Sequence, residues 1–261
     1  MTYTEIDLVP SIERLAGVEL AALTQQQRDG IDQFHSGGAE AVDRLLPGLD
    51  LTAEMTVLDV GSGLGGPARQ VARTVGCRVI GVDITQSYVD TARALTRADG
   101  TAERIQFFCT ELAAFNRTDF DAAYTLHVQM NVADKRRFFT DIAKRLRPGA
   151  RLATFEVCRA GPAEPALPLP WSVDGTDSHL ATPAELLDSI QHSGFDPIEW
   201  VDDTGWILQW FQELGPRVAA AGTQATLPAL LADGPTRMMN FAVALNTGVI
   251  TIHRGAFTRT G

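Results

Sequence analysis

The sequence predicts an α/β fold built on a largely parallel sheet, and three observations carry this prediction. Short apolar runs alternate with helical patterns between residues 56 and 157, which is typical of βαβ units with right-handed crossovers. Four glycines fall within residues 61–66, directly after the first apolar run. The 261 residues are enough for one large α/β domain with a sizeable core.

The elements up to the fifth strand follow one another in a regular order. The part before the first strand is expected to be mostly helical, with a break in the pattern at 32–38. Pro148-Gly149 turns the chain into the fifth strand. The predicted helices are 11–22, 39–46, 68–75, 85–98 and 134–146, and the predicted strands are 56–60, 78–82, 105–109, 121–126 and 151–157.

The regular order breaks after the fifth strand. Residues 161–179 are irregular and begin with a proline-rich run, which is typical of a lid or binding loop. Thr182-Pro183-Ala184-Glu185 supplies an N-cap, a proline and a capping acid for a helix to about residue 193. The remaining predictions are a strand at 195–201, helices over 204–247 with breaks at Gly222 and Pro228, and a last strand at 249–258 with a bulge at Gly255.

Composition narrows the classes of function. The chain has 22 basic and 32 acidic residues, a net charge of −10, which argues against binding nucleic acid or an anionic membrane surface. Three widely spaced cysteines favour reduced thiols over disulfides, and the five histidines show no metal-ligand spacing. Residues 1–7 lack a signal-peptide pattern, and no apolar run is long enough to span a bilayer. We therefore expect a soluble, cytoplasmic protein without a metal.

The glycine-rich stretch indicates a site for a nucleotide-like ligand. Glycines allow close approach of the backbone, and the following helix presents free N–H groups. Gly61, Gly63 and Gly66 also satisfy the dinucleotide fingerprint, so a nicotinamide cofactor is an alternative. Asp59 would be unfavourable beside a pyrophosphate but favourable beside an ammonium or sulfonium group. Asp83, about 20 residues after the loop, is placed to accept ribose hydroxyls; for both acids the alternative is a helix-capping or turn role.

Three stretches resemble the motifs of class I S-adenosylmethionine (SAM)-dependent methyltransferases. Residues 57–69 are similar to their first motif, and Gly81-Val82-Asp83-Ile84 resembles their second. Residues 146–152 resemble the turn before their fifth strand, with Ala150 in place of a glycine. The resemblance covers roughly residues 30–202. It implies a Rossmann-like seven-stranded, mostly parallel sheet with an antiparallel last strand and a helical cap. SAM would lie across the carboxyl ends of strands 1, 2 and 4.

Three further segments resemble small-molecule members, the sarcosine/dimethylglycine and tocopherol-type methyltransferases. They are residues 32–38, 124–131 and 167–171. One departure concerns the adenine: these enzymes often carry Gly-Asp after the third strand, where this chain has Cys109-Thr110-Glu111-Leu112. We expect Glu111 or Thr110 to substitute for the aspartate and Leu112 to pack on the adenine.

The predicted site therefore has three groups of residues. His127 and Asn131 are the catalytic candidates, His127 as a base or substrate contact; a structural or cofactor-binding role is its alternative. The predicted cofactor-binding residues are Gln33, His35, Asp59, Gly61, Ser62, Gly63, Gly65, Asp83, Ile84, Thr110, Glu111, Leu112 and His127. The predicted substrate contacts are Gln129, Trp171, His179, Trp206 and Asn240, with core packing the alternative for Trp206 and a solvated loop the alternative for His179.

These features predict one methyltransferase domain over residues 1–261. It would comprise a helical cap (1–50), a SAM-binding core (51–160), a lid loop (161–181) and a C-terminal part with cap helices (182–261). The expected function is methyl transfer from SAM to a small-molecule acceptor, a natural product or an amine. The alternatives are an NAD(P)-dependent oxidoreductase and a SAM-binding regulator or cyclase that transfers no methyl. The acceptor atom and the oligomeric state stay open.

Overall fold

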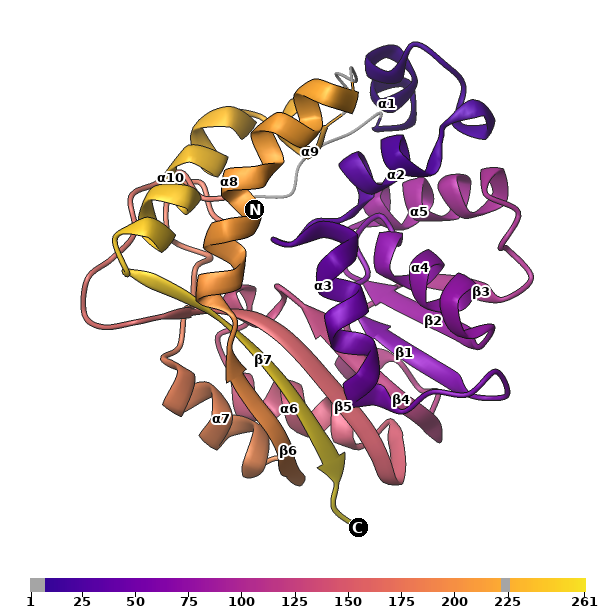
Figure 1. The fold of residues 1–261 in the computed structure, drawn as a ribbon. Helices are drawn as coiled ribbons and strands as arrows, with labels where there is room; N and C mark the ends of the chain where they lie inside the picture. The colour runs from indigo at the N-terminus through magenta and orange to yellow at the C-terminus, as the bar shows by residue number, and fades with distance from the viewer. Residues whose placement is uncertain (1–7, 222–225) are drawn as a thin grey trace.

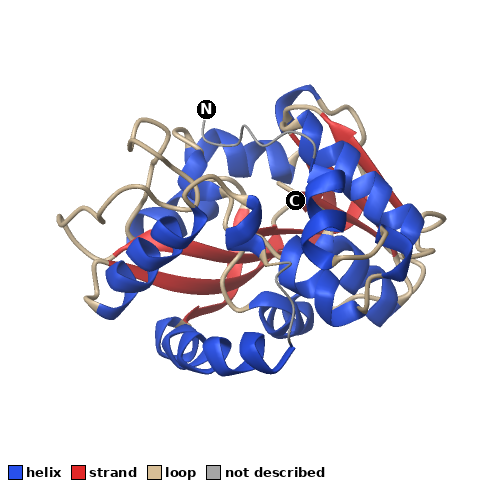
Figure 2. Ribbon diagram, turned by 90° about the horizontal axis from the view of Figure 1, so that it is seen from above, coloured by secondary structure: helices blue, strands red, loops and turns tan. Residues whose placement is uncertain are grey.

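A seven-stranded sheet forms the centre of the described residues, 8–221 and 226–261 of this computed structural model, with helices on both faces (Figures 1 and 2). The strand order is β3-β2-β1-β4-β5-β7-β6, and β7 runs antiparallel to both of its neighbours. This confirms the predicted Rossmann-like sheet with an antiparallel last strand. The strands are β1 Thr56–Val60, β2 Arg78–Asp83, β3 Ile105–Cys109, β4 Phe120–Leu126, β5 Leu146–Arg159, β6 Phe195–Asp202 and β7 Ile250–Arg259.

Helices connect the strands and cover the carboxyl edge of the sheet. The α-helices are α1 Leu8–Ala16, α2 Gln25–Asp32, α3 Gly38–Leu45, α4 Gly66–Val75, α5 Gln86–Ala98, α6 Lys135–Ala143, α7 Pro183–Gln191, α8 Thr204–Ala221, α9 Leu227–Leu230 and α10 Gly234–Asn246. Short 3₁₀ turns are η1 Leu20–Ala22, η2 Leu46–Leu49, η3 Leu112–Ala114 and η4 Gln129–Asn131. The expected break at Gly222 lies outside the described residues.

Two expected helices differ from the structure, and one helix of the structure was not expected. The helix predicted over 11–22 instead ends at Ala16, because Gly17 takes a left-handed φ of 70°. Helix α2 was not expected, although Thr24 and Gln27 form a capping box that the sequence displays. The helix predicted to reach Leu146 ends at Ala143, since Leu146 already pairs with Phe120 in the sheet.

The bulge predicted at Gly255 is wrong. Gly255 pairs regularly with Thr154 and with Trp200, and the register irregularity lies between Pro197 and Glu199 of β6 instead. A glycine stands here because a Cβ would lie 2.5 Å from the Phe257 ring and 2.8 Å from the Trp200 ring. Glycine is therefore needed at this position because the rings of Phe257 and Trp200 lie against its backbone.

Alternate residues of the central strands face two different cores. Val57 and Val79 belong to a cluster with residues of α3 and α4. Leu58 and Ile80, their neighbours in sequence, belong to a second cluster with residues of α6 and α7. Burial on both faces explains why these strands are continuous apolar runs in the sequence.

A helical cap stands over the carboxyl ends of the strands. Helices α8 and α10 rise from the β6–β7 side, and α1 and α2 lie across from them (Figure 1). Helix α9 contacts both α1 and α2. Leu230 of α9 packs in one apolar cluster with Leu8, Ile12 and Ile31. The N-terminal helices and the late helices thereby meet above the edge of the sheet.

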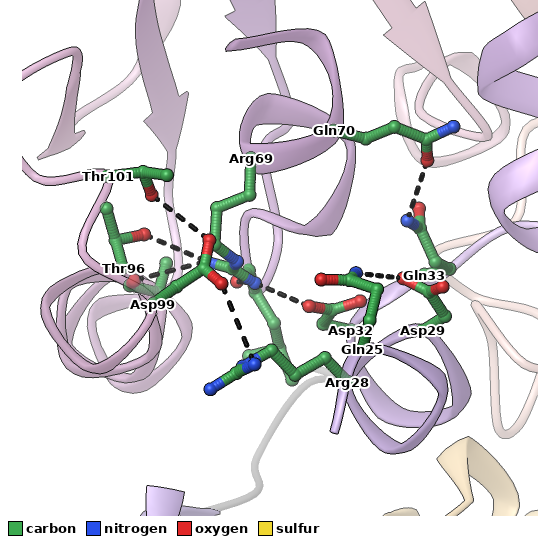
Figure 3. A network of polar contacts seen from close by, with 12 residues as sticks. Gln25, Arg28, Asp29, Asp32, Gln33, Arg69, Gln70, Thr96, Asp99 and Thr101 are labelled. Atoms are coloured by element: carbon green, nitrogen blue, oxygen red, sulfur yellow. Dashed lines mark hydrogen bonds and ion pairs between the residues drawn. The ribbon is translucent and has the colours of Figure 1, made fainter. Parts of the chain in front are cut away.

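A buried ion pair fastens the N-terminal helices to the glycine-rich turn. The Arg69 Nη2 of α4 lies 2.7 Å from the Asp32 Oδ2 at the end of α2, and both side chains are almost fully buried. The guanidinium also donates to the Thr96 hydroxyl (Figure 3). It donates as well to the Leu64 carbonyl oxygen in the glycine-rich turn. Burial raises the pKa of Asp32 to about 6, although the Arg69 charge opposes this shift. The pair joins three segments that are distant in sequence.

Replacing Asp32 with alanine leaves the Arg69 guanidinium buried without its counter-charge. We expect Asp32→Ala to lower the free energy of unfolding by about 3–5 kcal/mol, measured by urea denaturation. The matched control is Asp90→Ala, which removes the exposed Arg93–Asp90 pair and should change stability by less than about 1 kcal/mol. Equal effects of the two substitutions would contradict the assigned role of the buried pair.

Candidate functional site

The turn after β1 bends sharply over the end of β2. The Gly61 and Ser62 N–H groups both donate to the Val82 carbonyl oxygen, and Gly61 and Gly63 adopt left-handed φ values of 77° and 50°. A Cβ on Gly61 would lie 2.5 Å from a methyl group of Val128, so the loop after β4 presses directly on this turn. Helix α4 begins at Gly66, and its N-terminus faces the same space.

Asp59 lies buried beneath this turn with an unsatisfied oxygen. Its side chain is 2% exposed, and its Oδ2 has no hydrogen-bond partner among the described residues. Burial raises the pKa of Asp59 to about 7, and the Tyr124 hydroxyl beside it on β4 opposes this shift. The Ser62 hydroxyl is likewise buried without a partner. Asp59, Gly61 and Ser62 line one small cavity, so these orphaned oxygens fit a ligand that brings a cation and hydrogen-bond donors.

Asp83 closes the other side of the turn. Its Oδ2 accepts the Gly63 N–H and its Oδ1 accepts the Thr85 N–H, both at 2.9 Å. The Thr85 side chain makes no capping hydrogen bond. The carboxylate therefore holds the glycine turn against the first residues of α5. Burial raises the pKa of Asp83.

A cavity of about 570 Å³ opens between the strand ends and the cap. Ile84 projects into it with 71% of its surface exposed, an unusual position for a large apolar side chain. Leu112 lies on the lining too, and the two side chains offer apolar surface for a ring. The predicted residues that line the two cavities are His35, Asp59, Gly61, Ser62, Gly63, Asp83, Ile84, Thr110, Glu111, Leu112, His127, Asn131 and Trp171.

His127 follows β4 in a strained backbone conformation. Its φ is 54°, which is uncommon outside glycine. Its N–H donates to the Phe155 carbonyl oxygen, and its ring stacks on the Phe155 ring at a centroid distance of 5.5 Å. The Nε2 lies 3.2 Å from the Ser36 hydroxyl. Burial, together with the nearby His35, holds the pKa of His127 well below its usual range, so the imidazole is neutral at pH 7.

The buried carboxylate of Glu156 fixes the backbone beyond His127. It accepts the N–H groups of Val128 and Gln129 and the hydroxyl of Thr125. Burial raises the pKa of Glu156 to about 7. The Lys135 ammonium donates to the carbonyl oxygens of three residues in the same region, Gln129, Val132 and His179. Sequence reasoning missed both residues, although one acid inside the apolar run 152–158 was a usable signal.

Four of the predicted substrate contacts, Gln129, His179, Trp206 and Asn240, lie outside the cavity lining, and three of them make contacts elsewhere in the fold. The Gln129 side chain is fully buried and donates to the Val157 carbonyl oxygen. The Asn240 side-chain amide donates to the Pro168 carbonyl oxygen. Trp206 packs between Arg44, whose guanidinium lies 4.2 Å from its ring, and the core ring of Phe155. Each side chain serves a structural contact.

The fourth substrate candidate, His179, and two cofactor candidates, Gly65 and Gln33, also lie outside the cavity lining. His179 joins the lid to the turn after β4, because its N–H donates to the Met130 carbonyl oxygen. Gly65 packs so closely on the Phe107 ring that a Cβ would lie 2.5 Å away. Gln33 holds His35, whose Nε2 lies 2.9 Å from the Gln33 side-chain oxygen. Burial lowers the pKa of His35 to about 4, so this ring is neutral as well.

The described residues contain no cluster of three or more potential metal ligands. Within the same residues, none of the helices is long and apolar enough to cross a bilayer. All three cysteines are free thiols.

Comparison with known proteins identifies the central part of the chain. Residues 58–154 match a family model described as a methyltransferase domain. A curated relative, the methyltransferase GfsG of Streptomyces halstedii, is 30% identical over 133 residues, which are 50% of this chain and 48% of that protein. An arsenite methyltransferase of Halobacterium salinarum is 30% identical over 77% of this chain and 52% of its own length. The chain spans about half the length of these relatives.

Solved structures share the fold over most of the chain. The [4+2]-cyclase SpnF superposes with a TM-score of 0.72 at 20% identity, covering 97% of this chain and 93% of that one. Geranyl diphosphate C-methyltransferase of Streptomyces coelicolor, solved with S-adenosyl-L-homocysteine, gives a TM-score of 0.68 at 18% identity over 84% and 75% of the two chains. At these identities the likeness concerns the fold.

The contact between the glycine turn and Val128 can be tested with two alanine substitutions. Gly63→Ala adds only backbone strain, since nothing lies within 4 Å of a Cβ there, and should lower the free energy of unfolding by about 1–2 kcal/mol. Gly61→Ala adds the same strain and a clash with Val128, so we expect a further loss of about 1–3 kcal/mol in urea denaturation. Indistinguishable losses would show that the two loops do not press on each other.

Proposed function

We propose that the protein transfers a methyl group from SAM to a small-molecule acceptor, because residues 58–154 match a family model described as a methyltransferase domain. The observation that carries this proposal is the unsatisfied, buried Oδ2 of Asp59 beneath a glycine turn, with Asp83 braced on the same turn. A cationic, ribose-containing donor matches both carboxylates. The same buried acid disfavours a pyrophosphate, and hence the nicotinamide alternative.

The lining residues fit each part of the donor. Asp59 and Ser62 would hold the cationic amino-acid end, and their unpartnered oxygens support this assignment. Asp83 would accept the ribose hydroxyls. The apolar surfaces of Ile84 and Leu112 would contact the adenine, with Thr110 and Glu111 at its edge as the groups proposed to replace the usual aspartate.

For methyl transfer, the protein must align the acceptor atom with the methyl group and, where that atom carries a proton, accept the proton. Bound SAM supplies a methyl carbon whose bond to sulfur breaks, the electron pair staying on sulfur as a neutral thioether. A lone pair of the acceptor atom forms the new bond to carbon. If that atom carries a proton, His127 is placed to receive it, because its ring is neutral and lines the cavity. Asn131 lines the same wall and is proposed to orient the acceptor.

The remaining parts of the proposal concern organisation and location. We treat residues 1–261 as one domain in which 1–50 and the late helices cap the 51–160 core and 161–181 form a lid. Continuity of the sheet from β1 to β7 supports this view. The three free thiols support a reducing, cytoplasmic location. The acidic composition supports a small molecule, and not nucleic acid, as partner.

Binding and turnover together test the function. Isothermal titration calorimetry with SAM, S-adenosylhomocysteine, NAD and NADP should show binding of the first two compounds only. Incubation of the protein with SAM and candidate acceptors should then give products heavier by one CH₂ group in mass spectrometry. Absence of SAM binding would overturn the proposal. Binding with no methylated product across a broad acceptor panel would favour a SAM-binding cyclase or regulator.

Asp59 is expected to make donor binding dependent on pH. Its pKa is about 7 in the free protein, so the carboxyl must lose a proton at lower pH before it can face a cation. The dissociation constant of SAM should therefore rise as pH falls below 7, by up to about tenfold per pH unit. Asp59→Asn should bind SAM about 10–100-fold more weakly above this pH, without the dependence. A flat profile in the wild-type protein would contradict the role of Asp59.

His127 is expected to affect turnover far more than donor binding. His127→Gln should lower kcat by about 10²–10⁴-fold if the ring accepts the acceptor's proton, while the dissociation constant of SAM changes by less than about threefold, that is, by well under 1.4 kcal/mol. The control is His192→Gln, because His192 is an exposed residue paired with Asp188. Unchanged kcat, or a loss explained entirely by weaker SAM binding, would contradict the proton-accepting role.

A further inference from the structure

The acceptor side of the cavity is built from apolar side chains. The lid contributes Pro170 and Trp171, and the late helices and the segments that join them contribute Leu227, Leu231, Met238 and Phe241. Trp171 meets Phe241 edge to face at 5.9 Å, and Phe241 lies 6.2 Å from the His127 ring. These contacts place a continuous aromatic wall beside the proposed proton acceptor.

Polar groups of the lid form hydrogen bonds with one another. The Trp171 ring N–H donates to the Ser178 hydroxyl, and Ser172 donates to the Asp177 carboxylate. The exposed Asp174 accepts the Thr176 hydroxyl. The lid therefore uses its hydrogen-bonding groups to hold its own shape, and its apolar surface faces the cavity.

The charged residues on the cavity lining come from other segments. Asp83 ends β2 and Glu111 follows β3, on the proposed donor side. Asp134 caps α6, and Arg137 and Asp141 lie one turn apart on that helix, with the Arg137 Nε 3.9 Å from the Asp141 carboxylate. Among the described lining residues of the lid and of 226–246, none carries a charge.

We propose that the acceptor is an uncharged, largely apolar molecule that presents its reacting group to His127. This inference rests on the proposed function and adds the substrate class to it. On the wall formed by the lid and residues 226–246, a cationic amine would meet no carboxylate, and a phosphate or carboxylate would meet no lysine or arginine. Burying either charge unpaired is costly, whereas an apolar ring or chain gains from burial against Trp171 and Phe241.

Three ligands with the same ring and different charges test the inference. They are 2-naphthol (neutral), 2-naphthoate (anionic) and 2-naphthylmethylammonium (cationic). Each competes with the neutral fluorescent probe N-phenyl-1-naphthylamine for protein saturated with S-adenosylhomocysteine. We expect the probe to bind and 2-naphthol to displace it at least about tenfold more tightly than either charged ligand.

Several results would overturn the inference. They are an absence of probe binding, or equal or tighter binding of the cation or the anion. Preference for the anion would indicate that the ligand pairs with Arg137 on the lining, or reaches Arg237, whose buried guanidinium lies outside the lining with Nε and Nη1 unpartnered among the described residues. A failure of S-adenosylhomocysteine to bind is a different result, because it refutes the proposed function itself.

Adjacent methionines of α10 provide matched variants. Met238 lines the cavity, whereas Met239 is 63% exposed on the outer side of the helix. Met238→Asp should weaken 2-naphthol and strengthen 2-naphthylmethylammonium, each by about tenfold, while Met239→Asp leaves both affinities unchanged. Thermal unfolding and S-adenosylhomocysteine affinity verify that both variants are folded. If both variants are folded and behave alike, the inferred acceptor wall is wrong.

Discussion

The donor half of the site depends on the buried guanidinium of Arg69. A charge removed from water needs a counter-charge and partners for its N–H groups, and here these come from three separate segments. Asp32 ends α2, the Leu64 carbonyl belongs to the glycine turn, and Thr96 lies on α5 (Figure 3). Any shift of α2 against the turn would break this arrangement. Residues 33–38, which carry His35 and Ser36 to the cavity, are thereby held at a fixed distance from the glycines.

Two further buried side chains, Glu156 and Lys135, hold the backbone on the proposed acceptor side of the site. Glu156 receives two backbone N–H groups after His127, and Lys135 donates to three carbonyl oxygens, including that of His179 in the lid. A left-handed histidine costs about 1–3 kcal/mol and persists only where its surroundings over-determine it. Glu156 and the stacked Phe155 provide that constraint. The direction of the His127 ring is therefore set by groups that do not touch the cavity.

The sequence predicts the fold and part of the candidate site because both follow from local patterns. Asp59, the glycine turn and Asp83 end adjacent parallel strands, and strand ends of such sheets meet at one edge. Gln129, Trp206 and Asn240 were misplaced because their side-chain directions depend on distant partners, such as the Val157 and Pro168 carbonyl oxygens. The residues near these positions in the sequence do not indicate which distant groups the side chains will contact.

Asp32, Asp59 and Glu156 are buried acids with raised pKa values, and they differ in how the negative charge of the carboxylate is compensated. Asp32 is neutralised by Arg69, and Glu156 is solvated by backbone N–H groups. Asp32 and Asp59 both line the small cavity beneath the glycine turn, and each keeps one oxygen without a hydrogen-bond partner among the described residues, but of the two only Asp32 has an ion-pair partner there, Arg69. The folded-state pKa of Asp59, about 7, exceeds the unfolded value of 3.8, so its ionisation destabilises the free protein above pH 7, and this penalty disappears as pH falls toward the unfolded pKa. A cation bound there would remove the same penalty. The free-energy cost of the buried Asp59 charge therefore lies where a cationic donor would offset it. Donor binding is expected to stabilise the turn after β1 for this reason.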